Sequence, residues 1–165
     1  MAPETAAASI DAARARLLRL AGAWKGETRV WLEPGAEPDV SSIEGTLQGL
    51  LHDRFLTFTY QGTFGGDALE GMMLVGLHRE LAQAELTWVD TFHTGTAQMP
   101  CKGPLTDDGF SVLGAYSYVD EHGTVTTWGW RMVWVWNDDA LTITMYNVTP
   151  EGHEAKGVEM HLQRR

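Results

Sequence analysis

The chain has 165 residues, of which 44% are hydrophobic, and this length supports one domain with a substantial core. Its 22 acidic and 12 basic side chains give a formal net charge of −10, which repels phosphate backbones and anionic bilayers at long range. We therefore expect neither nucleic acid nor a membrane as a partner. Cys101 is the single cysteine, so an intrachain disulfide is impossible and a reducing compartment fits.

The beginning of the chain does not resemble a secretory signal. It lacks a positively charged segment followed by a long apolar stretch. No apolar run in the sequence approaches the ~20 residues that are needed to span a bilayer. We therefore expect a soluble, cytoplasmic protein.

One helix is predicted, over residues 9–21, after a flexible segment of residues 1–8. Ser9 suits the N-cap position, and Gly22 supplies a stop at the C-terminal end. Apolar residues recur at helical spacing, namely Ile10, Ala13, Leu17, Leu20 and Ala21. This helix should therefore lie against an apolar surface of the single domain, which we place at residues 9–165.

After the helix, short β-rich runs alternate with turn residues such as Glu33-Pro34-Gly35 and Asp107-Asp108-Gly109. The predicted strands are 24–32, 42–51, 54–62, 68–79, 84–92, 95–103, 109–119, 124–136, 140–148 and 154–164. With no helix between them, these strands indicate an all-β antiparallel meander, either closed into a barrel or folded as a two-sheet sandwich. We favour the closed barrel, because an open sheet of this size would leave exposed edges.

The segment 125–136 is the most aromatic of these strands. Alternation places five large side chains on one face, Trp128, Trp130, Met132, Trp134 and Trp136. The opposite face carries Arg131 among small and aliphatic residues. Because both faces are largely apolar, we expect one to line a barrel lumen and the other to be covered by the N-terminal helix or by a second subunit in a homodimer. This pattern favours a container over a catalytic cleft.

The segment Gly22-Ala23-Trp24, at the head of the first strand, resembles the Gly-x-Trp motif of the calycin superfamily. That superfamily includes lipocalins, fatty-acid-binding proteins and nitrobindin-like barrels. In this group the tryptophan closes the bottom of the barrel and often stacks with an arginine from a late strand. The resemblance therefore implies that Arg164 or Arg131 stacks on Trp24.

Longer runs resemble a bacterial family of unknown function, the domain-of-unknown-function family 1579. The similar segments are residues 70–76, 87–90, 131–133 and 145–156. What the resemblance implies is a lipocalin-like antiparallel barrel of about ten strands with one N-terminal helix, and no established activity.

Polar and amphipathic residues within the most apolar strands are the candidate ligand-binding residues. They are Tyr60, Glu70, Trp88, Asp90, His93, Arg131, Tyr146, Glu159 and His161. Burying a charge costs several kcal/mol unless it is paired, so an arginine among carboxylates is expected to form ion pairs. We predict that these residues orient the polar end of a small apolar or amphipathic molecule in the lumen. The alternative is that their strand faces point to solvent.

No metal-binding spacing and no nucleophile motif occurs, so we predict no metal site or cofactor and favour a binding protein over an enzyme. One alternative is a haem protein, because nitrobindin-like barrels bind haem through a late-strand histidine and the resemblance implies His161 for that role. Another is an enzyme in which His93 and Asp90 form an acid–base pair, which requires a strand end or bulge between them. A third is a barrel filled by its own side chains that serves as a protein-interaction module.

Overall fold

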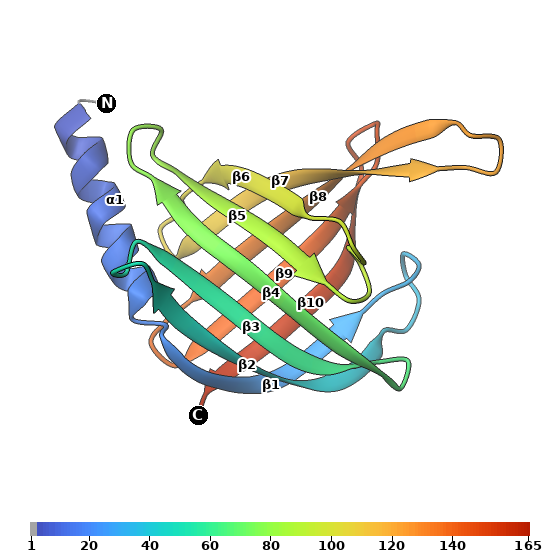
Figure 1. Cartoon of the computed structure of the whole chain (residues 1–165), viewed down its shortest axis with the longest axis horizontal. Helices are drawn as coiled ribbons and strands as arrows, with labels where there is room; N and C mark the ends of the chain where they lie inside the picture. The colour runs from blue at the N-terminus through green and yellow to red at the C-terminus, as the bar shows by residue number, and fades with distance from the viewer. Residues whose placement is uncertain (1–2) are drawn as a thin grey trace.

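A computed structural model describes residues 3–165, with side chains from Ser9 onward. One helix, α1 (Pro3–Leu18), precedes ten antiparallel strands (Figure 1). The strands are β1 (Gly22–Val30), β2 (Asp39–Leu50), β3 (Phe55–Phe64), β4 (Asp67–His78), β5 (Gln83–Asp90), β6 (Met99–Pro104), β7 (Gly109–Val119), β8 (Val125–Trp136), β9 (Ala140–Val148) and β10 (Glu154–Arg164). Each strand pairs with its sequence neighbours, and β1 also pairs with β10. The predicted closed all-β barrel is therefore confirmed.

The largest difference from the predicted strands lies between β5 and β6. The prediction carried one strand through residue 92 and began the next at residue 95, whereas β5 ends at Asp90 and β6 begins at Met99. The Asp90 carboxylate accepts hydrogen bonds from the backbone N–H groups of residues 92–94. Such local side-chain bonding competes with strand pairing, and it turns the chain out of the sheet.

Helix α1 is displaced toward the N-terminus relative to the prediction. It begins at Pro3 and ends at Leu18, whereas the prediction placed it at 9–21. Ser9 therefore lies inside the helix and does not cap it. Of the segment predicted to be flexible, residues 1–2 lie outside the described part of the chain.

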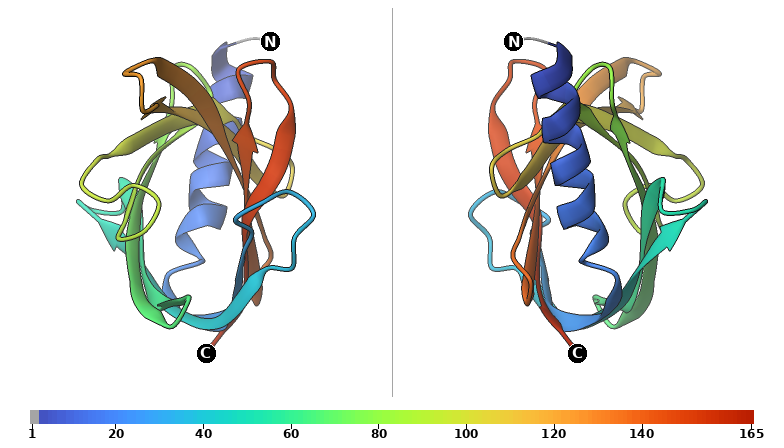
Figure 2. Two further views of the ribbon diagram at one scale, coloured as in Figure 1. Left: turned by 90° about the vertical axis from the view of Figure 1, so that its right-hand side faces the viewer. Right: turned by 90° about the vertical axis from the view of Figure 1, so that its left-hand side faces the viewer.

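Helix α1 closes one end of the barrel and does not cover strand β8. Figure 2 shows it running across the opening of the barrel. Leu17 of the helix and Leu20, just after its end, are buried, and Arg14 donates two hydrogen bonds to the Asp53 carbonyl in the β2–β3 turn. Of the two covers expected for residues 128–136, the helix is not the one found, because its contacts are with the barrel end, and cover by a second subunit stays a prediction.

The outer face of β8 carries fewer large apolar side chains than its inner face. Trp130, Met132 and Trp134 point into the lumen and are buried, as alternation requires. The outer positions hold Arg131, which is ion-paired, and aliphatic residues such as Val135, which is 38% exposed. Tryptophan bulk thus faces inward, and the aliphatic face is partly open to water.

Trp24 and Arg164 join the helix end to the barrel, as the calycin resemblance implied. The Trp24 indole is 1% exposed and donates from Nε1 to the Leu20 carbonyl over 2.8 Å. The Arg164 guanidinium lies 4.8 Å from the centre of the Trp24 ring. It also donates to three backbone carbonyls, two beside the end of α1 and one in the β8–β9 turn. Arg131 is not the stacking partner.

Replacing Arg164 by alanine should therefore loosen the closed end of the barrel. We expect the free energy of unfolding to fall by about 2 kcal/mol, because several charge-assisted hydrogen bonds and one cation–π contact are lost. The matched control is Arg165→Ala, which removes a single half-exposed ion pair with Glu44 and should cost less than about 1 kcal/mol. Urea unfolding of both variants measures the difference, and equal losses would contradict this role.

Candidate functional site

The lumen has a filled half and a hollow half along the barrel axis. Toward the α1 end, Trp134 stacks on Phe110 with ring centres 5.3 Å apart and meets Phe58 edge-on at 6.1 Å. Toward the opposite end, beside the β1–β2 and β5–β6 loops, lies a cavity of about 220 Å³. We call this space the mouth cavity.

The mouth cavity is lined mainly by aromatic and apolar side chains. Its lining residues are Val30, Trp31, Leu32, Trp88, Phe92, His93, Met99, Tyr116, Trp130, Asn147 and Gly157. Trp88 and Trp130 form one wall, with ring centres 5.5 Å apart and planes inclined by 20°. Gly157 leaves room for this wall, since a Cβ atom there would lie 3.1 Å from the Trp130 ring. An apolar cavity with a few placed polar groups is the usual form of a small-molecule site.

Asp90 and His93 form a hydrogen-bonded pair at the rim of the mouth cavity. His93 Nδ1 lies 2.7 Å from Asp90 Oδ2, and their side chains are 15% and 1% exposed. Because an ionised carboxylate can only accept, Nδ1 carries the shared hydrogen. The other ring nitrogen, Nε2, has no hydrogen-bond partner in the described part of the chain. Strand β5 ends at Asp90, and this is the strand end that an Asp90–His93 pair was expected to require.

The Asp90 carboxylate stays ionised despite its burial. Burial alone would raise its pKa, but the hydrogen bond from the His93 side chain and those from the backbone N–H groups of Thr94 and His93 hold the pKa below its ordinary value. Tyr60 shows the opposite effect, since burial and the nearby Asp90 charge raise the pKa of its hydroxyl. That hydroxyl accepts a hydrogen bond of 2.8 Å from Trp88 Nε1 and remains neutral.

Trp130 carries a buried donor without a partner. Its Nε1 has no acceptor within the described residues, and the side chain is 4% exposed. An unpaired buried donor costs about 1 to 3 kcal/mol, so an acceptor supplied from the cavity would be favourable. Nearby, Tyr116 donates from its hydroxyl to Asn147 Oδ1 over 2.7 Å, which places a second polar group on the lining.

The structure brings together four of the nine predicted site residues. Tyr60, Trp88 and Asp90 point into the lumen, and His93 lies at its rim. The other five, Glu70, Arg131, Tyr146, Glu159 and His161, do not point into the lumen. They occupy the outer positions of their strands, whose inner positions are taken by buried apolar residues. The strand faces that carry these five residues therefore point away from the lumen.

Arg131 forms its expected ion pair, but on the outer wall. Its Nε and Nη2 atoms lie 2.7 and 2.6 Å from the two carboxylate oxygens of Glu154. Its guanidinium also lies 4.3 Å from the centre of the Tyr146 ring. Arg131 therefore cannot pair with a ligand carboxylate in the lumen.

His161 and Glu159 likewise belong to an outer network on β10. Glu159 lies 2.7 Å from Lys156 Nζ and 3.3 Å from His161 Nε2. The inner positions beside them hold Met160 and Leu162, both buried. His161 thus does not fit the role of axial haem ligand within the barrel.

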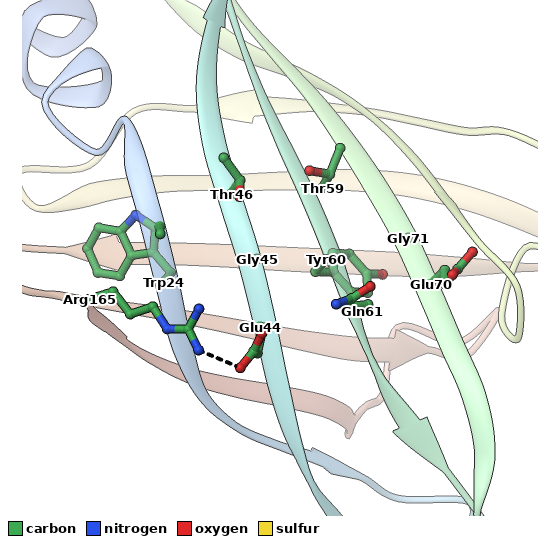
Figure 3. Close-up of a pocket in the computed structure, with 11 residues that line it drawn as sticks. Trp24, Glu44, Gly45, Thr46, Thr59, Tyr60, Gln61, Glu70, Gly71 and Arg165 are labelled. Carbon is green, nitrogen blue, oxygen red and sulfur yellow. Dashed lines mark hydrogen bonds and ion pairs between the residues drawn. The ribbon is translucent and has the colours of Figure 1, made fainter.

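A second hollow, of about 440 Å³, lies over strands β1–β4 (Figure 3). Glu44 and Arg165 meet at its edge in an ion pair of 2.8 Å. Glu70 contributes an exposed carboxylate to it, whereas the side chain of Tyr60 belongs to the lumen. This hollow is an open, polar surface and lacks the aromatic enclosure of the mouth cavity.

The sequence analysis did not predict several residues of the cavity lining, among them Tyr116, Asn147 and the pair Trp31-Leu32. Asn147 continues the inward face of β9 after Ile143 and Met145, so the period-two pattern contained its position. Trp31 and Leu32 follow the end of β1, and no periodicity reaches into that loop.

A model of the family described as "Protein of unknown function (DUF1579)" matches residues 10–164. The chain belongs to the DUF1579 family. The crystal structure of Rv2717c from M. tuberculosis is similar, with a TM-score of 0.58, 17% identity, and coverage of 93% of this chain and 97% of that chain. At this identity the similarity shows a shared fold alone. No curated protein matches the sequence.

Metal-binding groups and membrane-spanning helices are both absent from the described part of this DUF1579 member. In the part of the chain that is described, no group of three or more His, Cys, Asp or Glu side chains could hold a metal ion. No described helix combines the length and apolarity needed to cross a membrane.

The substitution Asp90→Asn should change how the stability of the protein depends on pH, because it removes the carboxylate that pairs with His93. Because the folded-state pKa of Asp90 is depressed, its carboxylate stabilises the protein above the ordinary value of 3.8, and this contribution is lost as pH falls through the folded value. We expect the variant to be less stable by about 1 to 3 kcal/mol at neutral pH. The difference should narrow as pH falls below 3.8.

Denaturant unfolding across this pH range, with Asp67→Asn as control, measures the effect. Asp67 is exposed at the start of β4, and its replacement should change stability little at any pH. A wild-type advantage over Asp90→Asn that persists unchanged at low pH would contradict the pairing.

Proposed function

We propose that this protein binds a small apolar or amphipathic molecule in the mouth cavity, with an aromatic ring as the favoured shape. The observation that supports this most directly is the aromatic and apolar lining of the mouth cavity, which includes Trp130 with its unpaired Nε1 donor. A buried donor that lacks a protein acceptor is a feature that a bound molecule would complete.

The size of the cavity limits the ligand. An engineered apolar cavity of about 150 Å³ binds benzene, so a volume of about 220 Å³ suits a single substituted ring. A long acyl chain would have to extend into the half of the lumen that Trp134, Phe110 and Phe58 occupy. We therefore propose a compact ligand and not a fatty acid.

The lining also suggests how such a ligand would be held. The aromatic side chains of the lining, among them Phe92, Tyr116 and Trp130, would pack against a ligand ring, which aromatic pairing favours. Polar groups of His93, Trp130 and Asn147 would orient its polar end. Asp90 and Tyr60, which were expected to contact the polar end of the ligand, would instead hold His93 and Trp88 in place by hydrogen bonds.

Binding can be tested with 4-nitroanisole, a single-ring probe without an acidic hydrogen, by isothermal titration calorimetry. Gly157→Leu adds bulk beside the Trp130 ring and should weaken binding at least about tenfold, since overpacking of such a site is unfavourable. Circular dichroism and thermal unfolding would establish that the variant is folded.

Two control variants carry substitutions outside the lumen. Ala115→Leu adds similar bulk at an exposed position of β7, and Arg131→Ala removes an outer-wall charge. Both should bind the probe as the wild type does. Absence of binding to the wild type, together with native mass spectra that retain no small molecule, would refute the proposed function.

A further inference from the structure

We propose that the mouth cavity selects aromatic weak acids of the phenol class and that His93 accepts the phenolic proton. This inference rests on the proposed function and specifies the chemistry of the ligand's polar end. It is carried by the two polar atoms of the rim that the protein leaves without partners, His93 Nε2 and Trp130 Nε1.

The first atom is a hydrogen-bond acceptor. In the tautomer that directs the Nδ1 hydrogen at Asp90, the His93 ring presents a lone pair at Nε2. The ring is packed among Trp88, Phe92 and Trp130, with centre-to-centre distances of 5.2, 4.7 and 5.6 Å. A ligand that meets Nε2 in this apolar setting must therefore supply a hydrogen.

The second atom is a hydrogen-bond donor. The indole Nε1 of Trp130 can only donate, so a ligand that meets it must supply a lone pair. The His93 and Trp130 ring centres lie 5.6 Å apart, and we propose that one small polar group meets both requirements. A hydroxyl meets both requirements, since it donates and accepts at one oxygen, whereas a carbonyl only accepts and an ammonium only donates. The aromatic lining favours a ring as the rest of the ligand, and an aromatic ring that carries a hydroxyl is a phenol.

The Asp90 carboxylate makes proton transfer favourable. When the phenol O–H bond breaks and an N–H bond forms at His93 Nε2, the resulting imidazolium lies between Asp90 and the phenolate. The phenolate oxygen then accepts hydrogen bonds from Nε2–H and from Trp130 Nε1–H. The total charge of the site is unchanged by this step. In the described structure Asp90 is the charged group in contact with His93, and Tyr60 and Tyr116 are the neighbouring titratable hydroxyls.

The test uses 4-nitrophenol, whose phenolate is yellow and whose neutral form is not. At a pH below the solution pKa of the probe, binding to wild-type protein should produce the phenolate absorption band. Affinity should exceed that for 4-nitroanisole by at least about tenfold, the size of one charge-assisted hydrogen bond. His161→Gln, which changes an exposed outer-wall histidine, should behave as the wild type does.

His93→Gln should abolish the phenolate band and remove the preference for 4-nitrophenol, while 4-nitroanisole still binds and so shows an intact cavity. Trp130→Phe keeps the ring, removes the donor and should reduce the preference. Equal affinity of the wild type for the two probes, or a phenolate band that survives in His93→Gln, would overturn this inference and leave the proposed function standing. Failure of the wild type to bind either probe would refute both.

Discussion

Closure of the sheet is the constraint on which the rest of the structure depends. In a closed barrel every strand has one face in the lumen and one outside, so each second residue must fill the interior. Glycines make this possible where rings cross the lumen: a Cβ atom at Gly45 would lie 2.3 Å from the Phe58 ring, and one at Gly71 would lie 2.2 Å from Tyr60. The same alternation sends the ion pairs of Arg131 and Glu159 to the outer wall.

The two ends of the barrel are unequal, and this inequality locates the site. Helix α1, Trp24 and Arg164 close one end through stacking and hydrogen bonds, and large aromatic rings fill the adjoining lumen. Among residues 3–165, no helix covers the opposite end, where the loops leave the strands (Figure 2). Space for a small molecule therefore remains where the aromatic packing stops.

Asp90 links local backbone structure to the chemistry of that space. One carboxylate oxygen ends β5 by binding successive backbone N–H groups, and the other orients the His93 ring. The turn that removes His93 from the strand is thus made by the residue that it pairs with. In the proposed function, this arrangement lets a rim histidine act on a ligand without exposing the carboxylate to water.

The sequence by itself determined the approximate strand count and favoured the antiparallel closure, because these follow from alternation and turn residues, and the resemblance of a local motif implied the Trp24 closure. It also gave, as one alternative, an Asp90–His93 pair that would require a strand end or bulge between the two residues. Tertiary structure alone decided which face of β10 points inward. Alternation separates the two faces of a strand, but the neighbouring strands determine which face is buried. Tertiary structure also decided where α1 lies and where the lumen is empty, because both depend on how side chains from distant strands share one enclosed volume.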